Sequence, residues 1–420
     1  MHDSFVFILC GAVMPVFLVA TGIRFGIRLR LFYILHPIKT AKAMLGGKGG
    51  FKALSLALAG TLGIGNIVGV ASALQWGGSG ALFWMVLSSV VAMSIKYAET
   101  FLSVKCRRFD GKAYTGGAPF YILEAVHGKK ARVLALIFAV MSILNSLITG
   151  NMVQINGVTG VLPVSPIVLG IGFSFAFFII ILEGVDRLSS FTSVIIPSLT
   201  FLHIFISLFI ILRNFGDISS VSRNIIKDAF NIKGAIYGVS TYSILTAVRY
   251  GVSRGVLSNE AGCGTSPIAH AETKNSPHVQ GCLGILEVLV DTAILCTITG
   301  TVILLYGIDT DISPIELVCA AYGFFAGKLG KIFIKVSCLI YALSTLLSQF
   351  YYGDKSLNYI TKRNKPHRIY LFIFVSVSII SPILPINTVW KISDLNIVFL
   401  TVFNLVILNL SLKSFEKSDF

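Results

Sequence analysis

Four glycines and one asparagine interrupt the stretch Ser55–Ala73 (SLALAGTLGIGNIVGVASA), which is otherwise apolar enough to span a membrane. The glycines are Gly60, Gly63, Gly65 and Gly69. They weaken the helix around Asn66, although in hydrocarbon every backbone N–H and C=O must find a partner. Such a break is tolerated where the freed groups line a cavity and hold an ion or a solute. The alternative is that the G-x-x-x-G spacing only lets two helices approach closely.

A second unusual stretch is Arg249–Ala269 (RYGVSRGVLSNEAGCGTSPIA), which breaks another apolar region. Its polar or helix-breaking residues are Ser258, Asn259, Glu260, Gly262, Gly264 and Pro267. Glycine, serine and proline favour a plain cytoplasmic loop. The close apolar flanks favour a discontinuous helix at membrane depth instead, where a buried glutamate is a functional or structural-pair candidate. Both readings stay open on composition alone.

The composition places the chain among polytopic membrane proteins. Its 420 residues are 55% hydrophobic and only 13% charged, and the mean hydropathy is +0.83. The net charge of +15 does not indicate nucleic-acid binding, because the basic residues lie in a few short loops between apolar runs. The seven cysteines show no C-x-x-C spacing, so neither a disulfide framework nor a zinc site is expected.

With about 20 apolar residues per crossing, the chain is expected to be an all-α polytopic protein of about eleven transmembrane helices. Basic loops favour the cytoplasm, so the N-terminus is expected outside and the C-terminus inside. The expected segments are an extra N-terminal helix (1–30), a basic cytoplasmic loop (31–53), a first five-helix repeat (54–212), an external linker (213–233), a second five-helix repeat (234–411) and a cytoplasmic tail (412–420).

The two interrupted stretches occupy corresponding places in the two halves of the chain. With the first helix set aside, each interruption opens a set of five spans, and an odd number of spans inverts the second repeat in the membrane. Paired glycine-interrupted segments at such positions are the best sequence indication of a transporter binding site.

Several motifs along nearly the whole chain resemble the alanine/glycine:cation symporter family, the sodium:alanine symporters. These motifs are GIGNIVGVASA (63–73), KYAETFLSVKCR (96–107), NMVQINGV (151–158), RGVLSNEAGCGTSPIAHAETK (254–274), QGCLGILEVLVDT (280–292) and STLLSQFYYGD (344–354). The resemblance implies a fold similar to that of the leucine transporter, a 5+5 inverted repeat preceded here by one extra helix. It implies co-transport of a small neutral amino acid, alanine or glycine above all, with Na⁺ as coupling ion and no organic cofactor. It also removes the loop reading of residues 258–264.

An amino-acid zwitterion needs N–H groups for its carboxylate and oxygen acceptors for its ammonium group. The loosened backbone around Gly63 and Gly65 offers N–H groups at a half-helix N-terminus, where the dipole favours an anion. Asn66 can donate and accept. By resemblance the substrate contacts also include Gln154, Val256, Asn259 and Gln349. Without the resemblance, Gln154 reads as a helix-to-helix hydrogen bond.

By the same resemblance, the sodium site lies between the first and eighth core helices, where hard Na⁺ finds oxygen ligands. The implied ligands are the carbonyls of Ala59, Leu62 and Tyr341 and the hydroxyls of Ser344 and Thr345. The alternative for the two hydroxyls is back-bonding to carbonyls of their own helix.

Two positions depart from the family pattern. Gln349 stands where the family usually carries Trp, so the pocket could admit a larger or more polar amino acid. Ile64 stands where Thr is usual, which removes one hydroxyl beside the broken helix. Both departures leave transport in place and weaken the assignment of alanine or glycine.

Other polar groups receive structural expectations. Glu260 is expected to cap helix ends or pair with Arg254, and Asp291 to hydrogen-bond the broken helix. Lys96 is expected to snorkel to the headgroups, and His270 to lie on the cytoplasmic surface. The partners expected overall are a small neutral amino acid and membrane lipid, with no nucleic acid, in a cell (plasma or inner) membrane.

A proton-coupled or exchange-type carrier on the same fold is the main alternative, with Glu260 or Asp291 titrating. A membrane-embedded enzyme is disfavoured because the sequence has no phosphate loop or His/Asp metal cluster. A channel is disfavoured because no repeated pore loop is present.

Overall fold

The computed structural model describes residues 8–45, 50–109, 111, 113–182, 185–231 and 243–415. These residues are nearly all helical, apart from an antiparallel hairpin of β1 (Arg108–Phe109) and β2 (Tyr114–Thr115). The helical elements are η1 (Leu9–Val13), α2 (Met14–Arg28), α3 (Phe32–Leu35), α4 (Pro37–Leu45), α5 (Gly50–Thr61), η2 (Ile64–Asn66), α6 (Val68–Gly77), α7 (Gly80–Lys105), α8 (Ala118–Ala125), α9 (Lys129–Leu147), η3 (Ile148–Met152), α10 (Val153–Gly157), α11 (Pro166–Leu182), α12 (Val185–Arg213), α13 (Phe215–Ala229), α15 (Ile244–Asn259), α16 (Pro267–Ala271), α17 (Pro277–Val288), η4 (Leu289–Cys296), α18 (Thr297–Tyr306), α19 (Pro314–Ile360), α20 (Asn364–Ile380), η5 (Ser381–Ile383), α21 (Ile386–Leu410) and η6 (Ser411–Ser414).

Within the described residues, eight helices are long and apolar enough to cross a membrane. This confirms the prediction of an all-α polytopic protein. Helix α11 has 17 residues and is shorter than a full span. The two interrupted helices, α5 with α6 and α15 with α16, are also divided into pieces that are individually too short.

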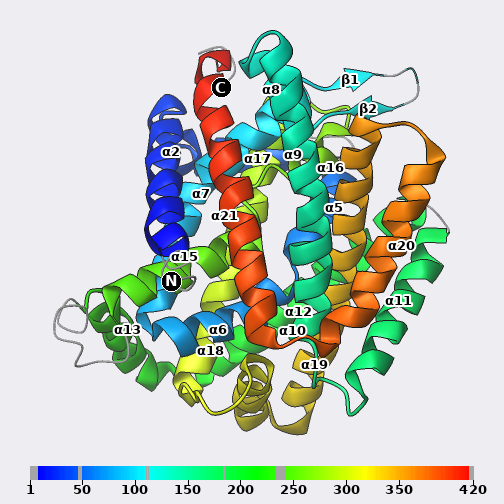
Figure 1. Ribbon diagram of the computed structural model, residues 1–420. Coiled ribbons are helices and arrows are strands. Elements are labelled where there is room, and N and C mark those ends of the chain that lie inside the picture. Colours follow the sequence, from blue (N-terminus) through cyan, green and yellow to red (C-terminus); the bar gives the residue numbers. More distant parts are fainter. Residues whose placement is uncertain are drawn as a thin grey trace.

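The helices pack as a bundle in which α7 and α9 each carry several neighbours. Helices α15 and α17 pack on α7, α19 packs on α9, and α15 also packs on α6. In Figure 1, α2, α21 and α9 run upright, with the C-terminus at the upper end and the N-terminus below α2. The arrangement brings the two interrupted helices together in the interior of the bundle.

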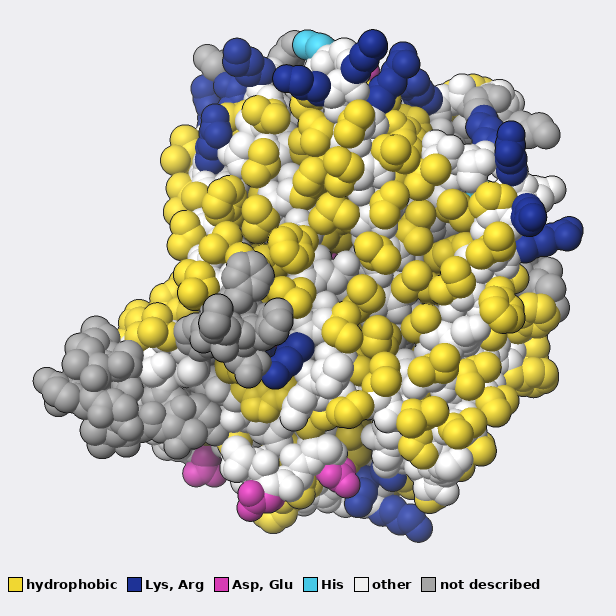
Figure 2. Space-filling model, viewed as in Figure 1, with side chains coloured by type: hydrophobic (Ala, Val, Ile, Leu, Met, Phe, Trp, Pro, Cys, Tyr) yellow, Lys and Arg dark blue, Asp and Glu magenta, His cyan; other side chains and the backbone are white. Residues whose placement is uncertain are grey.

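The outer surface fits a lipid environment. Figure 2 shows hydrophobic side chains over a broad belt, with Lys and Arg gathered along the upper edge. Many large apolar side chains of the helices are exposed, and Phe201 and Phe372 are 72% and 74% exposed. In water such a surface would be unfavourable, whereas lipid tails solvate it.

Two segments differ from the simplest reading of the sequence. The expected linker at 213–233 contains helix α13, which is tied to α7 because Ser79 Oγ donates to Asp228 Oδ2 at 2.6 Å. The long helix α19 is kinked at Gly327, whose φ of 63° lies in the left-handed region that glycine adopts without strain.

Candidate functional site

The first break lies where the glycines predict it. Helix α5 ends at Thr61, the short turn η2 covers Ile64–Asn66, and α6 starts at Val68. The Ile64 N–H has left the helical pattern and donates to Gln154 Oε1 at 3.0 Å. The substrate candidate Gln154 therefore faces the loosened backbone of this break.

Residues 258–264 form a break between two helices and not a cytoplasmic loop. Helix α15 ends at Asn259, Glu260 has a left-handed φ of 51°, and α16 begins at Pro267. Gly262 and Gly264 also have positive φ, 89° and 73°, which glycine adopts without a steric penalty. The whole segment is buried, so the prediction of a discontinuous helix is confirmed.

The two breaks meet through two asparagines and the π-helical turn η4. Asn66 Nδ2 donates to the carboxylate oxygen Oδ1 of Asp291 at 2.8 Å. Asn259 Nδ2 donates to Thr292 Oγ1 at 2.9 Å, and that hydroxyl donates to Asp291 Oδ2 at 2.6 Å. The expectation that Asp291 hydrogen-bonds the broken helix is therefore confirmed. π-Helical turns occur frequently at functional sites, and η4 places two polar side chains here.

Two of the oxygen atoms expected to bind the ion also lie close together. Thr345 Oγ1 donates to the carbonyl of Ala59 at 3.1 Å, which joins α19 to α5. Leu62 is buried in the adjoining break. Ser344 Oγ donates to the Tyr341 carbonyl of its own helix at 2.9 Å, the back-bonding arrangement left open by the sequence.

Gly63 lies beside one residue of the expected substrate site, Gln154, and one of the expected sodium site, Thr345. A Cβ atom at this position would be 2.6 Å from Gln154 Oε1 and 2.7 Å from Thr345 Oγ1. Only a residue without a side chain fits between these oxygens. Gly65 is similarly close to the second break, because its Cβ would lie 3.0 Å from Ser258 Cα.

Gln349 reaches from α19 to the second break. Its Nε2 donates to Glu260 Oε1 at 2.6 Å, and the other Glu260 oxygen accepts from Thr265 Oγ1 at 2.6 Å. Gln349 Oε1 is buried without a hydrogen-bond partner among the described residues. Across from it, Gly150 leaves room for the Gln349 side chain, because a Cβ there would be 2.2 Å from Gln349 Cβ.

Val256 is buried one turn before the second break. Its exposed fraction is 1%, and its carbonyl accepts the Glu260 N–H at 2.8 Å. This places it beside Asn259 on the end of α15.

Two expectations about charged or titratable side chains are wrong, those for Lys96 and His270, and so is one of the two alternatives for Glu260, its pairing with Arg254. Arg254 pairs with Asp394 on α21 rather than with Glu260, and its guanidinium lies 4.2 Å from the ring centroid of Trp390. Lys96 does not snorkel, and His270 is not on the surface, since both side chains are 0% exposed. The two cations instead pair with carboxylates on other helices, Arg254 with Asp394 and Lys96 with Glu287.

A buried polar cluster joins α7, α16 and α17. Lys96 Nζ lies 3.1 Å from Glu287 Oε1 and donates to Ser266 Oγ at 2.7 Å. His270 Nδ1 and Gln280 Oε1 are 2.6 Å apart. The cluster fixes the second half of the broken helix to the two helices beside it.

Glu99, three residues after Lys96 on α7, and Asn404 on α21 also hold the second break. The Gly262 N–H donates to Glu99 Oε2 at 3.1 Å, and Asn404 Nδ2 donates to the Gly262 carbonyl at 2.9 Å. The sequence analysis assigned no role to Glu99 or Asn404. Glu99 could have been found, because it lies in the motif KYAETFLSVKCR (96–107) and a charged residue within a membrane span is itself a sign of a buried partner.

Lys96→Met is expected to destabilise the protein by about 3–5 kcal/mol, because it leaves the buried Glu287 carboxylate without its ammonium partner. Glu287→Gln should destabilise it similarly, and the double variant Lys96→Met/Glu287→Gln should recover much of the loss. Thermal unfolding of the four purified proteins in one detergent measures this coupling. Equal midpoints for all four proteins would contradict it.

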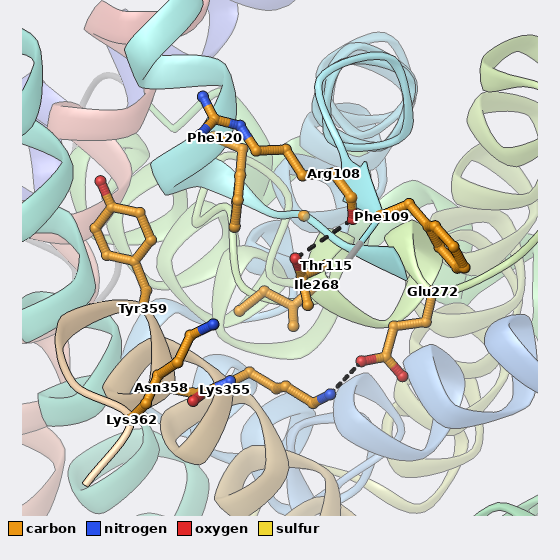
Figure 3. A pocket seen from close by; sticks show the side chains of 11 residues that line it. Arg108, Phe109, Thr115, Phe120, Ile268, Glu272, Lys355, Asn358, Tyr359 and Lys362 are labelled. Carbon is orange, nitrogen blue, oxygen red and sulfur yellow. Dashed lines mark hydrogen bonds and ion pairs between the residues drawn. The ribbon is translucent and has the colours of Figure 1, made fainter. Parts of the chain in front are cut away.

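A cavity of about 340 Å³ lies at the upper end of the bundle, between the β hairpin, α16 and the end of α19. Figure 3 shows Lys355 of α19 turned towards Glu272, which directly follows α16. Their charged atoms are 2.5 Å apart. This ion pair ties α19 to the second broken helix at the end where the cations gather, and the cavity contains none of the predicted substrate residues.

Comparison with known proteins gives a match along the whole chain. The profile of the sodium:alanine symporter family matches residues 2–418. The sodium/alanine symporter AgcS of Methanococcus maripaludis is 33% identical, over 93% of this chain and 89% of its own length. The uncharacterized transporter YflA of Bacillus subtilis is 32% identical, over 95% of this chain and 88% of its own length.

A solved structure shares the fold. MhsT in complex with L-phenylalanine superposes with a TM-score of 0.59 and 15% identity, over 89% of this chain and 90% of that chain. At this identity the match concerns the fold alone, and it confirms the leucine-transporter-like architecture.

Proposed function

The chain belongs to the sodium:alanine symporter family, a family of transporters rather than enzymes, and we propose that it imports a small neutral amino acid, alanine or glycine, together with Na⁺. The proposed mechanism is alternating access around the two breaks. Broken helices supply N–H groups for an anionic substrate group and carbonyls for the ion at the middle of the membrane.

The observation that carries this proposal is the position of Gly63. A Cβ atom at Gly63 would lie within 2.7 Å of both Gln154 Oε1, a proposed substrate contact, and Thr345 Oγ1, a proposed ion ligand. A substrate bound at Gln154 and an ion bound at Thr345 would therefore both depend on the backbone at Gly63, and each would favour the same geometry of the break. A shared preference for one conformation is what coupling between two ligands requires.

In the proposed site, N–H groups near Gly63 and Gly65 hold the substrate carboxylate. Asn66 and Asn259 fix the two breaks through Asp291 and Thr292, as their hydrogen bonds allow. The remaining proposed substrate contacts are Gln154, Val256 and Gln349. The proposed Na⁺ ligands are the carbonyls of Ala59, Leu62 and Tyr341 and the hydroxyls of Ser344 and Thr345.

We also propose eleven crossings in total, made by the eight long helices, α11 and the two interrupted helices. The upper end in Figure 1 would then face the cytoplasm. The support is the gathering of Lys and Arg at this edge in Figure 2, as the positive-inside rule requires. The N-terminus would lie outside and the C-terminus inside a cell membrane.

The proposal is tested by uptake of labelled alanine into proteoliposomes with an inward Na⁺ gradient, against a matched K⁺ gradient. Uptake that depends on Na⁺ and is blocked by unlabelled glycine supports it. Uptake that follows a proton gradient and ignores Na⁺ would support the proton-coupled alternative, with Glu260 or Asp291 as the candidate proton site.

A second candidate substrate class is a larger, polar amino acid such as one with a side-chain amide. The observation that favours it is the buried Gln349 Oε1, which has no partner among the described residues and could accept a hydrogen bond from such a substrate. An unpaired buried acceptor costs about 1–3 kcal/mol, which a donor on the substrate would offset.

Gln349→Leu is therefore expected to weaken competition by glutamine about tenfold relative to competition by glycine, if the pocket takes amide side chains. The measurement is the ratio of the two inhibition constants for labelled alanine uptake, in the variant and the parent protein. The ratio cancels a general loss of activity that follows because Glu260 Oε1 loses the donor Gln349. An unchanged ratio would exclude Gln349 as the group that selects a polar substrate.

A further inference from the structure

A cavity of about 690 Å³ lies beside the end of α2, away from the proposed transport site. It is formed where the chain reverses direction after α2 and continues into the short helices α3 and α4. The reversal uses Arg30 and Leu31, two consecutive non-glycine residues with left-handed φ values of 53° and 47°. Because this conformation is uncommon for such side chains, the turn holds a defined shape.

The polar lining of this cavity is cationic. Arg28, Arg30 and Lys39 line it together with the polar residues His36, Thr40 and His278. None of the described residues that line it is acidic, and the chain has no Asp or Glu between Asp3 and Glu99. Arg28 donates to the carbonyl of Phe415, a neutral acceptor. The cavity is therefore suited to an anion.

The apolar side chains beside these cations are exposed to the surroundings of the protein. Ile27 and Leu35, both in the cavity wall, are 71% and 65% exposed, and Ile38 on α4 is 71% exposed. In Figure 2 the cations of this end lie at the upper margin of the hydrophobic belt. A ligand that fills the cavity and follows this surface must be anionic at one end and apolar at the other.

We propose that this cavity binds the phosphate headgroup of an anionic phospholipid, with Arg30 and Lys39 on the phosphate and an acyl chain along Ile27 and Leu35. Cationic pockets of this kind between helix ends recognise lipid headgroups. A bound lipid would stabilise the positions of α3 and α4, which pack on one another and precede the first broken helix. Binding does not depend on the proposed transport function and can be measured without it.

The test is lipid retention by the purified full-length protein in detergent, measured by native mass spectrometry. Phosphatidylglycerol and phosphatidylcholine with identical acyl chains are titrated in parallel. The parent protein is expected to retain phosphatidylglycerol at least about fivefold better, because each Lys or Arg adds attraction to an anionic headgroup. Equal retention of the two lipids would overturn the proposal.

The site variant is Arg30→Asn/Lys39→Ala, in which asparagine tolerates the left-handed backbone at position 30. The matched control, Lys130→Ala/Lys365→Ala, removes two exposed cations from the same end of the protein. The site variant should lose the preference for phosphatidylglycerol and the control should keep it within twofold. Equal losses in both variants would show that general surface charge holds the lipid, and would overturn the proposed site.

Two further experiments test whether charge holds the lipid and whether the site binds a lipid headgroup or free phosphate. Arg30→Lys/Lys39→Arg keeps both charges and should keep the preference, so its loss there would contradict a charge-based site. Inorganic phosphate at 10 mM (about the concentration of a buffer) should not displace the lipid. Displacement of most of the lipid would assign the site to free phosphate rather than to a lipid headgroup.

Discussion

Gly63→Ala is expected to reduce Na⁺-driven amino-acid uptake at least about tenfold. The new Cβ would be 2.6 Å from Gln154 Oε1 and 2.7 Å from Thr345 Oγ1, distances at which something must shift. Both side chains are restrained by hydrogen bonds, since Gln154 Oε1 accepts from the Ile64 N–H and Thr345 Oγ1 donates to the Ala59 carbonyl. A displacement of about 1 Å at a positioned site is enough for losses on the order of 100-fold. Initial uptake rates in proteoliposomes, normalised to reconstituted protein, measure the effect.

Gly69→Ala is the matched control on the same interrupted helix. The nearest atoms to a Cβ at this position are 3.9 Å away, which is ordinary van der Waals contact. Uptake by this variant should stay within twofold of the parent, and alanine even favours the helix relative to glycine. If Gly63→Ala transports as well as Gly69→Ala, the first break is not the place where substrate and ion are held.

Thr345→Val is expected to raise the Na⁺ concentration for half-maximal uptake about tenfold or more. Valine keeps the shape of threonine but removes the hydroxyl that contacts the Ala59 carbonyl. A hydrogen bond or ligand interaction with a charged partner is worth about 1.5–3 kcal/mol, and 1.4 kcal/mol corresponds to a factor of ten in affinity. Uptake at a fixed alanine concentration over a range of Na⁺ concentrations gives the value.

Two companion variants make this result specific. Thr345→Ser keeps the hydroxyl and should restore Na⁺ affinity to within about threefold of the parent. Ser356→Ala removes a hydroxyl three turns further along α19 that bonds the Tyr352 carbonyl, and should leave Na⁺ affinity unchanged. A normal Na⁺ dependence in Thr345→Val would place the ion elsewhere.

The local features of the site could be predicted from the sequence because their signals are local. Glycine weakens a helix wherever it stands, so the residues around Gly63 and Asn66 indicated a break, although the G-x-x-x-G spacing left close helix packing as an alternative. The second break was ambiguous by composition, and the family resemblance rather than any local rule favoured the discontinuous helix over a loop.

The supporting contacts were not predictable because they join residues far apart in the chain. Arg254 pairs with Asp394, 140 positions away, although Glu260 is much nearer in sequence. Lys96 was expected at the membrane surface because lysine usually snorkels, and only the packing of α17 against α7 reveals Glu287 beside it. The π-helical turn η4, which presents Asp291 and Thr292 to the breaks, likewise has no signature in the hydrophobic pattern.

The most direct test of the central proposal is whether the amino acid moves the ion. Proteoliposomes containing the purified protein are equilibrated with labelled Na⁺ at equal concentrations on both sides, and an inward alanine gradient is then imposed. Because coupling free energy is reciprocal, we expect labelled Na⁺ to accumulate inside transiently, and to do so far less with Gly63→Ala than with Gly69→Ala. Alanine entry without any movement of Na⁺ would contradict Na⁺ coupling and would favour the proton-coupled alternative.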